Sequence, residues 1–371
     1  MNALILTASA GGGHVHTAEA IYKYIISNDP NSKINVVDTL KYINPVIDKV
    51  IIGGYLKIIK LRPSIYEKIY DLTETDSGLT NMSSKFYELL ANRLIPLILD
   101  MNPDIIVCTH PFPTEMMSIL KNNNKLDYPV ATILTDYAPH NSWIHSRIDA
   151  FIVANSDMVE DMVNRGVNRN QIFDLGIPVN PSFIQEFDRE LTLKEINFSS
   201  NKFTILVMGG SLGMGRITDI YNKLINIKSD IQVIVITGKN KKLYSELIKI
   251  SESSNLPTKI IGYTSEVNKL MQASDLLITK PGGLTITEAL ISKIPIAIFS
   301  PIPGHEVRNA DFLIRHDLAV NLGKGESATS VIENLISSDT ALTSMKLRYE
   351  EFSRPHCGND IYKLLKIISR A

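Results

Sequence analysis

Residues 3–26 read ALILTASAGGGHVHTAEAIYKYII, an apolar run followed by three glycines and then by apolar residues at helical spacing. This order predicts a buried parallel strand that turns sharply into an amphipathic helix. The glycines allow a tight turn and a close approach of the backbone to a ligand, and the helix start offers N–H groups to an anionic or hydroxyl-rich group. The stretch therefore predicts the first strand and helix of a doubly wound α/β domain.

The same alternation of short apolar runs and helical patterns continues along the chain. It pauses at a polar stretch, Gln185–Lys202, and then restarts. The expected strands are Ala3–Thr7, Ile34–Asp38, Asp104–Thr109, Val130–Thr135 and Ala150–Ala154, then Phe203–Met208, Ile231–Thr237, Lys259–Ile261, Asp275–Thr279 and Pro295–Phe299. We therefore predict an α/β fold of two Rossmann-like, doubly wound domains that face a central cleft, because open α/β sheets bind ligands at the carboxyl ends of their strands.

The length of 371 residues exceeds what one hydrophobic core usually organises, which agrees with two domains. The expected linker lies in a polar region that also holds Pro178 and Pro181. The expected boundaries are 1–185 for the first domain, 186–202 for the linker, 203–350 for the second domain, and 351–371 for a C-terminal helix that packs back on the first domain.

Composition excludes several classes of function. The chain carries 38 basic and 39 acidic residues, so no global field favours nucleic acid or a membrane. Its two cysteines, Cys108 and Cys357, form no CxxC pair, which argues against a disulfide framework or a cysteine zinc site and fits a reducing cytosol. No uncharged apolar run reaches the length of a transmembrane helix, so a soluble or monotopic protein is expected.

A basic and apolar segment in the first half is a candidate membrane contact. Residues 44–71 read NPVIDKVIIGGYLKIIKLRPSIYEKIYD. The apolar residues at helical spacing are Ile47, Val50, Ile51, Tyr55, Ile58 and Ile59, and the accompanying basic residues are Lys49, Lys57, Lys60, Arg62 and Lys68. Such a pattern suits a helix that lies on anionic lipid, but an apolar stripe of this kind is also typical of a helix that faces the protein core.

The glycine loop leads into His14, which is expected at the helix N-terminus. The helix dipole there would lower the pKa of the imidazole and keep it neutral, ready to act as a general base. The alternative is a loop histidine that only hydrogen-bonds the backbone. A dinucleotide site is a weaker alternative, because the spacing is not GxGxxG and only Asp38 could contact a ribose.

The second half holds two further glycine turns after expected strands. Residues 208–215, MGGSLGMG, and residues 279–289, TKPGGLTITEA, present backbone N–H groups at a helix start, where a diphosphate would be stabilised. Glu288, about two turns into the second helix, could accept both hydroxyls of a ribose or could form a surface salt bridge. Residues 303–310, PGHEVRNA, could contact a sugar. No acidic pair lies nearby, so no metal ion is expected.

Five motifs taken together resemble one enzyme family. They are GGGHVHTAEAI at 11–21, TDYAPHNSW at 135–143, GGSLGMGR at 209–216, KPGGLTITEAL at 280–290 and PIPGHEVRNA at 301–310. Over nearly its whole length the chain is similar to monogalactosyldiacylglycerol synthases and processive diacylglycerol beta-glucosyltransferases, inverting enzymes of the two-Rossmann GT-B fold. The GlcNAc transferase of peptidoglycan synthesis shares the glycine loop with its histidine and the donor helix, but the TDYAPHNSW motif is similar to the diacylglycerol enzymes.

The resemblance implies an enzyme attached peripherally to the inner face of the cell membrane. It would move a hexose from a UDP-sugar to diacylglycerol or glycosyl-diacylglycerol, without a metal ion or another cofactor, and nucleic acid would not be a partner. The first domain would bind the acceptor and the membrane, and the second the UDP-sugar. Glucose is favoured over galactose by a composition rich in Asn, Ile and Lys, which is typical of low-GC bacteria. The alternatives on the same fold are a UDP-GlcNAc transferase, a UDP-sugar 2-epimerase and a non-catalytic UDP-sugar sensor.

The resemblance also implies roles for individual residues. Either His14 or Asp136 would be the catalytic base, and amides at Gly282 and Gly283 would stabilise the charge on the β-phosphate. Acceptor contacts would come from Gly12, Gly13, His140 and Trp143, and donor contacts from Gly210, Ser211, Lys280, Gly282, Gly283, Leu284, Thr285, Glu288, His305, Glu306 and Asn309. The family motif has glutamine where this chain has His305, a departure that concerns the hexose contacts.

Overall fold

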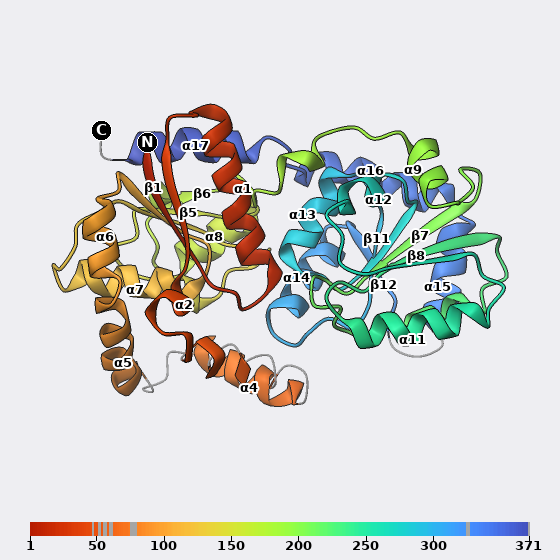
Figure 1. Cartoon of the computed structure of the whole chain (residues 1–371), viewed down its shortest axis with the longest axis horizontal. Coiled ribbons are helices and arrows are strands. Elements are labelled where there is room, and N and C mark those ends of the chain that lie inside the picture. The colour runs from red at the N-terminus through yellow and green to blue at the C-terminus, as the bar shows by residue number, and fades with distance from the viewer. Residues whose placement is uncertain are drawn as a thin grey trace. The chain divides into compact units, whose positions relative to one another are not determined.

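The computed structural model describes residues 1–46, 48–50, 53–54, 58, 62–74, 80–323 and 327–369. The chain forms two compact units. The first comprises Met1–Pro181, Pro303–His305 and His356–Ala371, and the second comprises Ser182–Ile302 and Glu306–Pro355 (Figure 1). The last helix therefore belongs to the first unit, although it follows the second unit along the chain.

The first unit is built on a six-stranded parallel sheet in the order β2-β1-β3-β4-β5-β6. Its strands are β1 (Asn2–Thr7), β2 (Lys33–Asp38), β3 (Ile105–Cys108), β4 (Val130–Ile133), β5 (Ala150–Ile152) and β6 (Ile172–Phe173). The central strands β3, β4 and β5 are buried along their whole length, as expected for a parallel sheet covered by helices on both faces. Leu6, Cys108 and Thr132 are aligned in register, so β1, β3 and β4 end at one edge.

Two helices of this unit begin at side chains that cap them. His110 caps α7 (Pro111–Asn122), because its Nδ1 accepts a hydrogen bond from the Phe112 amide, and Asn155 caps α8 (Ser156–Asn164) through its side-chain oxygen. The other helical elements are α1 (Gly12–Asn28), α2 (Thr39–Ile43), α4 (Pro63–Glu74), α5 (Thr80–Asn92), α6 (Ile95–Met101) and α17 (Cys357–Ile368), with short 3₁₀ turns η1 (Asn141–Trp143), η2 (Arg169–Gln171) and η3 (Pro181–Phe183).

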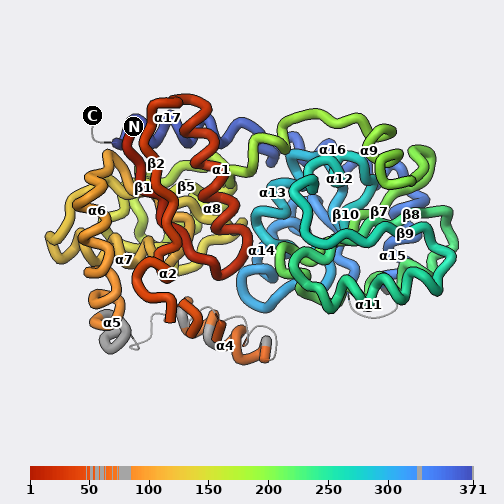
Figure 2. Tube along the Cα trace, viewed as in Figure 1, coloured from red at the N-terminus to blue at the C-terminus, as the bar shows by residue number. Residues whose placement is uncertain are grey.

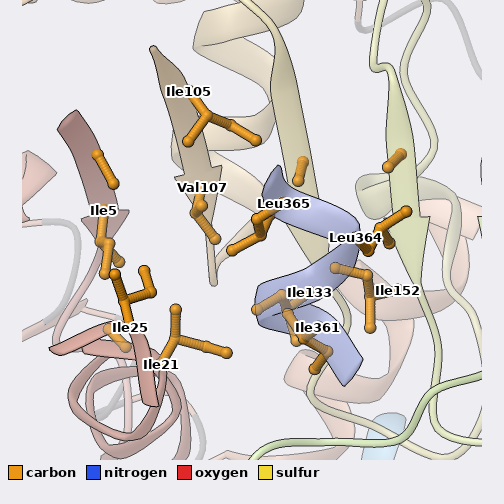
Figure 3. Close-up of a cluster of buried hydrophobic side chains, with 14 residues drawn as sticks. Ile5, Ile21, Ile25, Ile105, Val107, Ile133, Ile152, Ile361, Leu364 and Leu365 are labelled. Carbon is orange, nitrogen blue, oxygen red and sulfur yellow. The ribbon is translucent and has the colours of Figure 1, made fainter. Parts of the chain in front are cut away.

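The C-terminal helix α17 is part of the core of the first unit. Its Ile361, Leu364 and Leu365 belong to one buried cluster that also contains Ile21 and Ile25 of α1 and residues of β1, β3, β4 and β5 (Figure 3). Figure 2 shows α17 close to α1, and the two helices are in contact. Burial of a Leu or Ile side chain contributes roughly 1.5–3 kcal/mol. The first core is therefore incomplete without the end of the chain.

A glycine allows α17 to approach α1 closely. A Cβ at Gly358 would lie 2.2 Å from Cδ2 of the Tyr24 ring, far inside van der Waals contact. The Tyr24 ring is itself buried, at 4% exposure, and cannot move aside into solvent. Glycine is therefore required at this position of α17 for its packing.

The second unit has its own six-stranded parallel sheet, in the order β12-β11-β10-β7-β8-β9. Its strands are β7 (Phe203–Met208), β8 (Ile231–Ile236), β9 (Thr258–Ile261), β10 (Leu276–Thr279), β11 (Ile296–Ile298) and β12 (Ala319–Asn321). Its helices are α9 (Arg189–Glu195), α10 (Ile217–Leu224), α11 (Lys241–Glu252), α12 (Val267–Gln272), α13 (Gly283–Ile291), α14 (His305–Arg315), α15 (Ser327–Ile336) and α16 (Asp339–Phe352). The prediction of two Rossmann-like α/β domains is confirmed by the two sheets.

The predicted strands are all present, with ends that differ by at most two residues. The sequence does not predict the edge strands β6 and β12, which are 2 and 3 residues long and therefore too short to show a periodic pattern.

The stretch expected to be a linker, residues 186–202, contains the helix α9. Asp188 caps this helix by accepting a hydrogen bond from the Leu191 amide, and Leu193 is fully buried. The boundary between the units falls earlier, at Pro181 and Ser182. The sequence predicts a linker here because α9 is short and most of its residues are polar. Its few buried residues give little helical periodicity.

Both sheets reverse their strand order between two central strands, β1 and β3 in the first sheet and β7 and β10 in the second. Loops that follow such a pair of strands diverge to opposite faces, and open α/β sheets bind ligands at this point. The glycine turns at 11–13, 209–215 and 282–283 follow β1, β7 and β10. The sheet topology thus places all three turns at positions suited to ligand binding.

Candidate functional site

The first candidate site lies at the reversal point of the first unit, around His14, the third residue of α1. The Nδ1 atom of His14 lies 2.8 Å from the carbonyl oxygen of Thr109 and 3.0 Å from Oγ1 of Thr135. Because a carbonyl oxygen can only accept, we assign the proton to Nδ1, which donates it to Thr109. In the neutral ring the lone pair is then on Nε2, the tautomer that a general base acting through Nε2 needs.

Burial is the main influence on the charge of His14. It lowers the pKa of the imidazole below its usual value, while the charge of Asp136 and the hydrogen bond to Thr109 oppose the shift. The sequence predicts the same direction but assigns it to the helix dipole, and the structure corrects the main cause to desolvation. The imidazole is therefore neutral near pH 7.

A second histidine, His110, lies against His14, with ring centroids 4.4 Å apart in an edge-on arrangement. Burial, and then the charge that His14 would carry, hold the pKa of His110 well below its usual value. The sequence pattern does not predict a role for His110, although this residue directly follows the predicted strand at 104–109. His110 follows β3, the strand that pairs with β1, and β1 leads to His14. This position at the end of an adjacent strand is the signal that could have identified it.

The TDYAPHNSW motif follows β4 and lies beside His14. Thr135 contacts the His14 ring directly, Asp136 acts on it electrostatically, and the ring of Trp143 lies 6.0 Å from it between centroids. Trp143 is only 3% exposed. The structure thus brings together His14, Asp136 and Trp143, three of the residues predicted for this site. Their roles in catalysis and acceptor binding stay predictions.

His140 of the same motif makes its contacts within the first unit. Its Nδ1 accepts a hydrogen bond from the Ser142 amide, and its Nε2 lies 3.2 Å from the Tyr70 carbonyl oxygen and 3.2 Å from Oε2 of Glu74. The Tyr70 ring packs on the imidazole at 4.2 Å. His140 therefore attaches α4 to the loop after β4. A bound acceptor substrate could reach its ring nitrogens only by displacing these partners.

The glycine loop leaves open space at the start of α1. Gly12 and Gly13 are the first helical residues, and Gly11 before them has an extended backbone with φ 165°. A Cβ at Gly11 would meet no atom within 4 Å. Space beside a helix N-terminus suits a hydroxyl-rich or anionic ligand, so the open loop is consistent with the predicted acceptor contacts.

The basic segment at 44–71 is described in part. Lys49, Arg62 and Lys68 are exposed. Val46 and Val50 are each 67% exposed, so these two apolar side chains do not face the core. The following predicted members lie outside the described residues: Lys57, Lys60, Ile47, Ile51, Tyr55 and Ile59.

The second candidate site begins with the glycine loop after β7. A Cβ at Gly213 would lie 2.1 Å from the Thr237 carbonyl oxygen, so this glycine serves the packing of the loop itself. Gly210 has a left-handed backbone with φ +70° and open space around it. The carbonyl of the next residue, Ser211, accepts a hydrogen bond from the Lys239 amide at 3.0 Å. The loop is thus held in place while Gly210 leaves room for a ligand.

The turn after β10 leads into α13, with Gly282 at its N-cap. The Gly282 amide donates to the Lys280 carbonyl oxygen at 2.9 Å, and a contact of this amide with a phosphate stays a prediction. The amides of Gly283, Leu284 and Thr285 form the first turn of the helix and have no acceptor within it. These three amides are therefore the groups that can bind an anion at the positive end of α13.

Three residues predicted to contact the donor also bind each other and the loop, and their donor contacts stay predictions. Nζ of Lys280 lies 2.9 Å from Oε1 of Glu306, whose Oε2 accepts a hydrogen bond from the Ile302 amide at 2.7 Å. Asn309 is fully buried, and its Nδ2 donates to the Pro281 carbonyl oxygen at 3.0 Å. These contacts fix the turn that precedes α13, so the residues position the amides of that helix.

Glu288, in the second turn of α13, has a different environment. It is half-buried, and none of the described residues offers it a hydrogen bond or an ion pair, so the surface salt bridge is not found. Burial raises the pKa of its carboxyl group to about 8. A carboxyl group held in this way without a protein partner indicates a ligand site.

His305 is the first residue of α14, but Pro303–His305 group with the first unit, whereas Glu306 and Asn309 belong to the second. A contact of His305 with the hexose stays a prediction.

In the part of the chain that the structure describes, no helix is long and apolar enough to cross a membrane. Nor does any group of three or more His, Cys, Asp or Glu side chains there have an arrangement that could hold a metal ion. The groups described above that can bind an anion are backbone amides.

Two family models match the chain, one in each half. Residues 14–179 match the family described as monogalactosyldiacylglycerol (MGDG) synthase, and residues 204–365 match the glycosyltransferase family 28 C-terminal domain. The processive diacylglycerol beta-glucosyltransferase of Bacillus thuringiensis is 30% identical over 366 residues, which cover 96% of this chain and 91% of that protein. The protein of the same name from Staphylococcus carnosus is 30% identical over 347 residues, which cover 92% and 86% of the two chains.

Solved structures with a similar fold have lower sequence identity. MurG of Acinetobacter baumannii has a TM-score of 0.64 at 14% identity and covers 99% of both chains. HepE of Anabaena in complex with UDP-glucose has a TM-score of 0.58 at 14% identity, over 99% of this chain and 100% of that one. These similarities show the fold alone, and they confirm the predicted GT-B fold class.

Proposed function

Because the chain belongs to the family of monogalactosyldiacylglycerol synthases and processive diacylglycerol beta-glucosyltransferases, we propose that it transfers a hexose from a UDP-sugar to diacylglycerol, with glucose preferred to galactose. Family membership makes it a glycosyltransferase that acts on diacylglycerol. The identity of the sugar, the nucleotide and the residues that act on them is the part we propose.

One observation supports the chemistry of the first unit above the others, the hydrogen bond from Nδ1 of His14 to the Thr109 carbonyl oxygen. It directs the lone pair of a neutral imidazole to Nε2, and burial keeps the ring neutral. The acceptor hydroxyl oxygen attacks the anomeric carbon while its proton passes to Nε2 of His14, and the bond from that carbon to UDP breaks. A single displacement of this kind inverts the anomeric configuration.

The second unit supplies the donor site in this proposal. The diphosphate binds the amides of Gly283, Leu284 and Thr285, which stabilise the charge that develops on the leaving UDP. The ribose hydroxyls bind Glu288, which has no partner among the described residues. We propose that helix N-terminal amides take the place of a divalent cation, so transfer is independent of metal ions.

The proposal is tested by incubation of the protein with vesicles of dioleoylglycerol and one donor at a time: UDP-glucose, UDP-galactose or UDP-GlcNAc. We expect hexosyl-diacylglycerol from UDP-glucose by mass spectrometry, with most of the activity retained in EDTA. Product only from UDP-GlcNAc, lipid-independent epimerisation of UDP-GlcNAc, or binding of UDP-sugars without turnover would each support one of the rival functions. Loss of activity in EDTA that Mg²⁺ or Mn²⁺ restores would refute the metal-free donor site.

With a pKa of about 8, the Glu288 carboxyl group is mostly protonated at pH 7, so its hydrogen bonds to the ribose join neutral groups. Substitution Glu288→Ala is therefore expected to weaken UDP binding by about 0.5–1.5 kcal/mol for each hydrogen bond lost. Calorimetry with UDP measures this change, and Glu333→Ala on α15 is a control outside the donor site. Unchanged UDP affinity would remove Glu288 from the ribose site.

The raised pKa of Glu288 gives the same variant a second readout. Between the usual pKa of 4.5 and the folded value of about 8, the folded protein retains a proton that the unfolded chain has lost. The contribution of this group to stability is therefore lost as pH rises through that window. Glu288→Ala should flatten the fall in the free energy of unfolding between pH 5 and 8, measured by urea denaturation at several pH values.

The exposed basic residues at 62 and 68 are proposed to bring the protein to anionic membrane. Each basic side chain near a charged surface contributes about 1 kcal/mol, and the attraction fades beyond a Debye length of about 8 Å. The double substitution Arg62→Gln and Lys68→Gln should therefore weaken binding to phosphatidylglycerol vesicles by about 2 kcal/mol without altering UDP affinity. Vesicle sedimentation measures the effect, with Lys242→Gln and Lys249→Gln on α11 as the charge-matched control. Equal sedimentation of all three proteins would exclude this surface as the membrane contact.

A further inference from the structure

Four aromatic rings follow one another away from His14 in the first unit. The His14 ring contacts His110 at 4.4 Å between centroids, and His110 stacks on Phe112 at 4.8 Å. Phe112 in turn stacks on Tyr87 at 6.2 Å, and Tyr87 contacts Phe86 at 6.4 Å. We call His110, Phe112, Tyr87 and Phe86 the aromatic row.

The aromatic row passes from the interior of the unit to its surface. His110 is only 6% exposed, Phe112 and Tyr87 are half-buried, and Phe86 is 46% exposed. The row crosses from α7 to α5, two helices that pack against each other (Figure 1). It therefore begins beside the proposed base and ends at an exposed apolar side chain on α5.

The surroundings of the row are apolar enough to affect ionisable groups. Glu115, one turn after Phe112 on α7, has no hydrogen bond or ion pair with any described residue, and burial raises the pKa of its carboxyl group to about 7. Burial, and then the charge of Glu115, raise the pKa of the Tyr87 hydroxyl. Glu115, Tyr87 and Phe112 are all half-buried where α5 and α7 pack together.

We propose that the aromatic row is the binding site for an acyl chain of the lipid acceptor. The inference rests on the proposed function, because it takes the acceptor hydroxyl to lie at Nε2 of His14. A glycerol hydroxyl held there places the ester-linked chains within reach of His110 and Phe112, and the aromatic row leads from that point to the exposed ring of Phe86. The exposed parts of the half-buried Phe112 and Tyr87 rings and the exposed ring of Phe86 offer apolar surface to methylene groups, and each buried methylene contributes to binding.

Photolabelling with acceptor analogues tests the position of the chain. A diacylglycerol with a diazirine near the ester is expected to label peptides that contain Phe112 and Glu115, and one with a diazirine at the chain end should label peptides that contain Phe86 and Tyr87. Excess dioleoylglycerol should suppress both labels, whereas excess dioleoylphosphatidylcholine should not. Labelling outside α5 and α7, or equal suppression by both lipids, would overturn the inference, and the second result would identify the surface as a contact for bulk lipid.

Chain-length selectivity gives an independent test with the full-length protein. Phe86 is exposed, so Phe86→Ser is not expected to disturb folding. We expect this variant to lose about tenfold in kcat/KM for dioleoylglycerol relative to dihexanoylglycerol, since contacts with about two methylene groups are lost. Phe86→Leu should retain most of the selectivity. Leu99→Ser on α6, which removes a 57% exposed apolar side chain elsewhere in the unit, should leave it unchanged.

The outcomes separate this inference from the proposed function. One outcome is that the wild-type protein transfers to both acceptors while Phe86→Ser lowers kcat/KM by the same factor for both, or for neither. That result overturns the acyl-chain site and leaves the proposed function intact. Absence of transfer to either acceptor by the wild-type protein overturns both.

Discussion

Substitution His14→Ala is expected to slow glycosyl transfer by about 10²–10⁴-fold, the usual contribution of a positioned general base. The variant loses the group whose Nδ1 is held by the Thr109 carbonyl oxygen and whose Nε2 takes the acceptor proton in the proposed mechanism. Initial rates with UDP-glucose and dioleoylglycerol measure the effect. UDP affinity should not change, because the groups proposed to bind UDP, the amides of Gly283 to Thr285 and the Glu288 carboxyl group, lie in the second unit.

Two further variants decide between the candidate bases. His16→Ala, two residues along α1, is the matched control and should retain activity. Asp136→Asn should reduce the rate less than His14→Ala if Asp136 acts on His14 through its charge. A larger loss in Asp136→Asn than in His14→Ala would make the aspartate the base.

The pH dependence of kcat/KM gives the same assignment a separate readout. Burial lowers the pKa of His14, so the base stays unprotonated at pH values where an exposed histidine would be charged. The acid limb of the profile should therefore lie below the usual histidine value of about 6.5. In Asp136→Asn the limb should move further toward acid, because the charge that opposes the shift is removed.

Substitution Lys280→Ala is expected to destabilise the second unit by about 3–5 kcal/mol, because it leaves a buried carboxylate without its counter-charge. The side chains of Lys280 and Glu306 are only 9% and 6% exposed, and their charged atoms are 2.9 Å apart. Urea denaturation monitored for the second unit measures the loss. Lys280→Met with Glu306→Gln should cost less, since neither charge is then buried alone.

The exposed pair Lys293–Glu350 provides the control for this effect. Its side chains are 60% and 62% exposed, and Nζ and Oε1 are 3.2 Å apart. Pairs in such positions contribute about 0–1 kcal/mol, so Lys293→Ala should change stability little. If Lys280→Ala and Lys293→Ala lower the free energy of unfolding equally, the loss in Lys280→Ala does not come from breaking the buried ion pair.

Local sequence pattern predicts much of this fold. Runs such as Phe203–Met208 are apolar throughout because both faces of a parallel sheet are covered, and that pattern does not depend on distant residues. The glycine turns after β1 and β10 are also local patterns, and they predict the ends of the sheets where a ligand is expected. The short edge strands β6 and β12 and the helix α9 lack this signal, since each has few buried residues.

The candidate site is less predictable, because its contacts join residues far apart in the sequence. Lys280 and Glu306 are both predicted as donor contacts, but sequence does not show that they bind each other. Nor does it show that Glu288 is half-buried with no partner among the described residues, or that His110 and Thr109 contact His14. The sequence pattern identifies which residues lie at the end of a strand. Their burial, and the side chains with which they form hydrogen bonds or ion pairs, depend on the packed structure.

The position of α17 has a consequence for biosynthesis. A ribosome completes β1 to η2 of the first unit early, but the side chains of Ile361, Leu364 and Leu365 are made only after the whole second unit. Until then the cluster that contains Ile5, Ile21 and Val107 lacks the side chains of α17. The nascent first unit must therefore wait for the end of its own chain with part of its core uncovered, while the second unit can fold first.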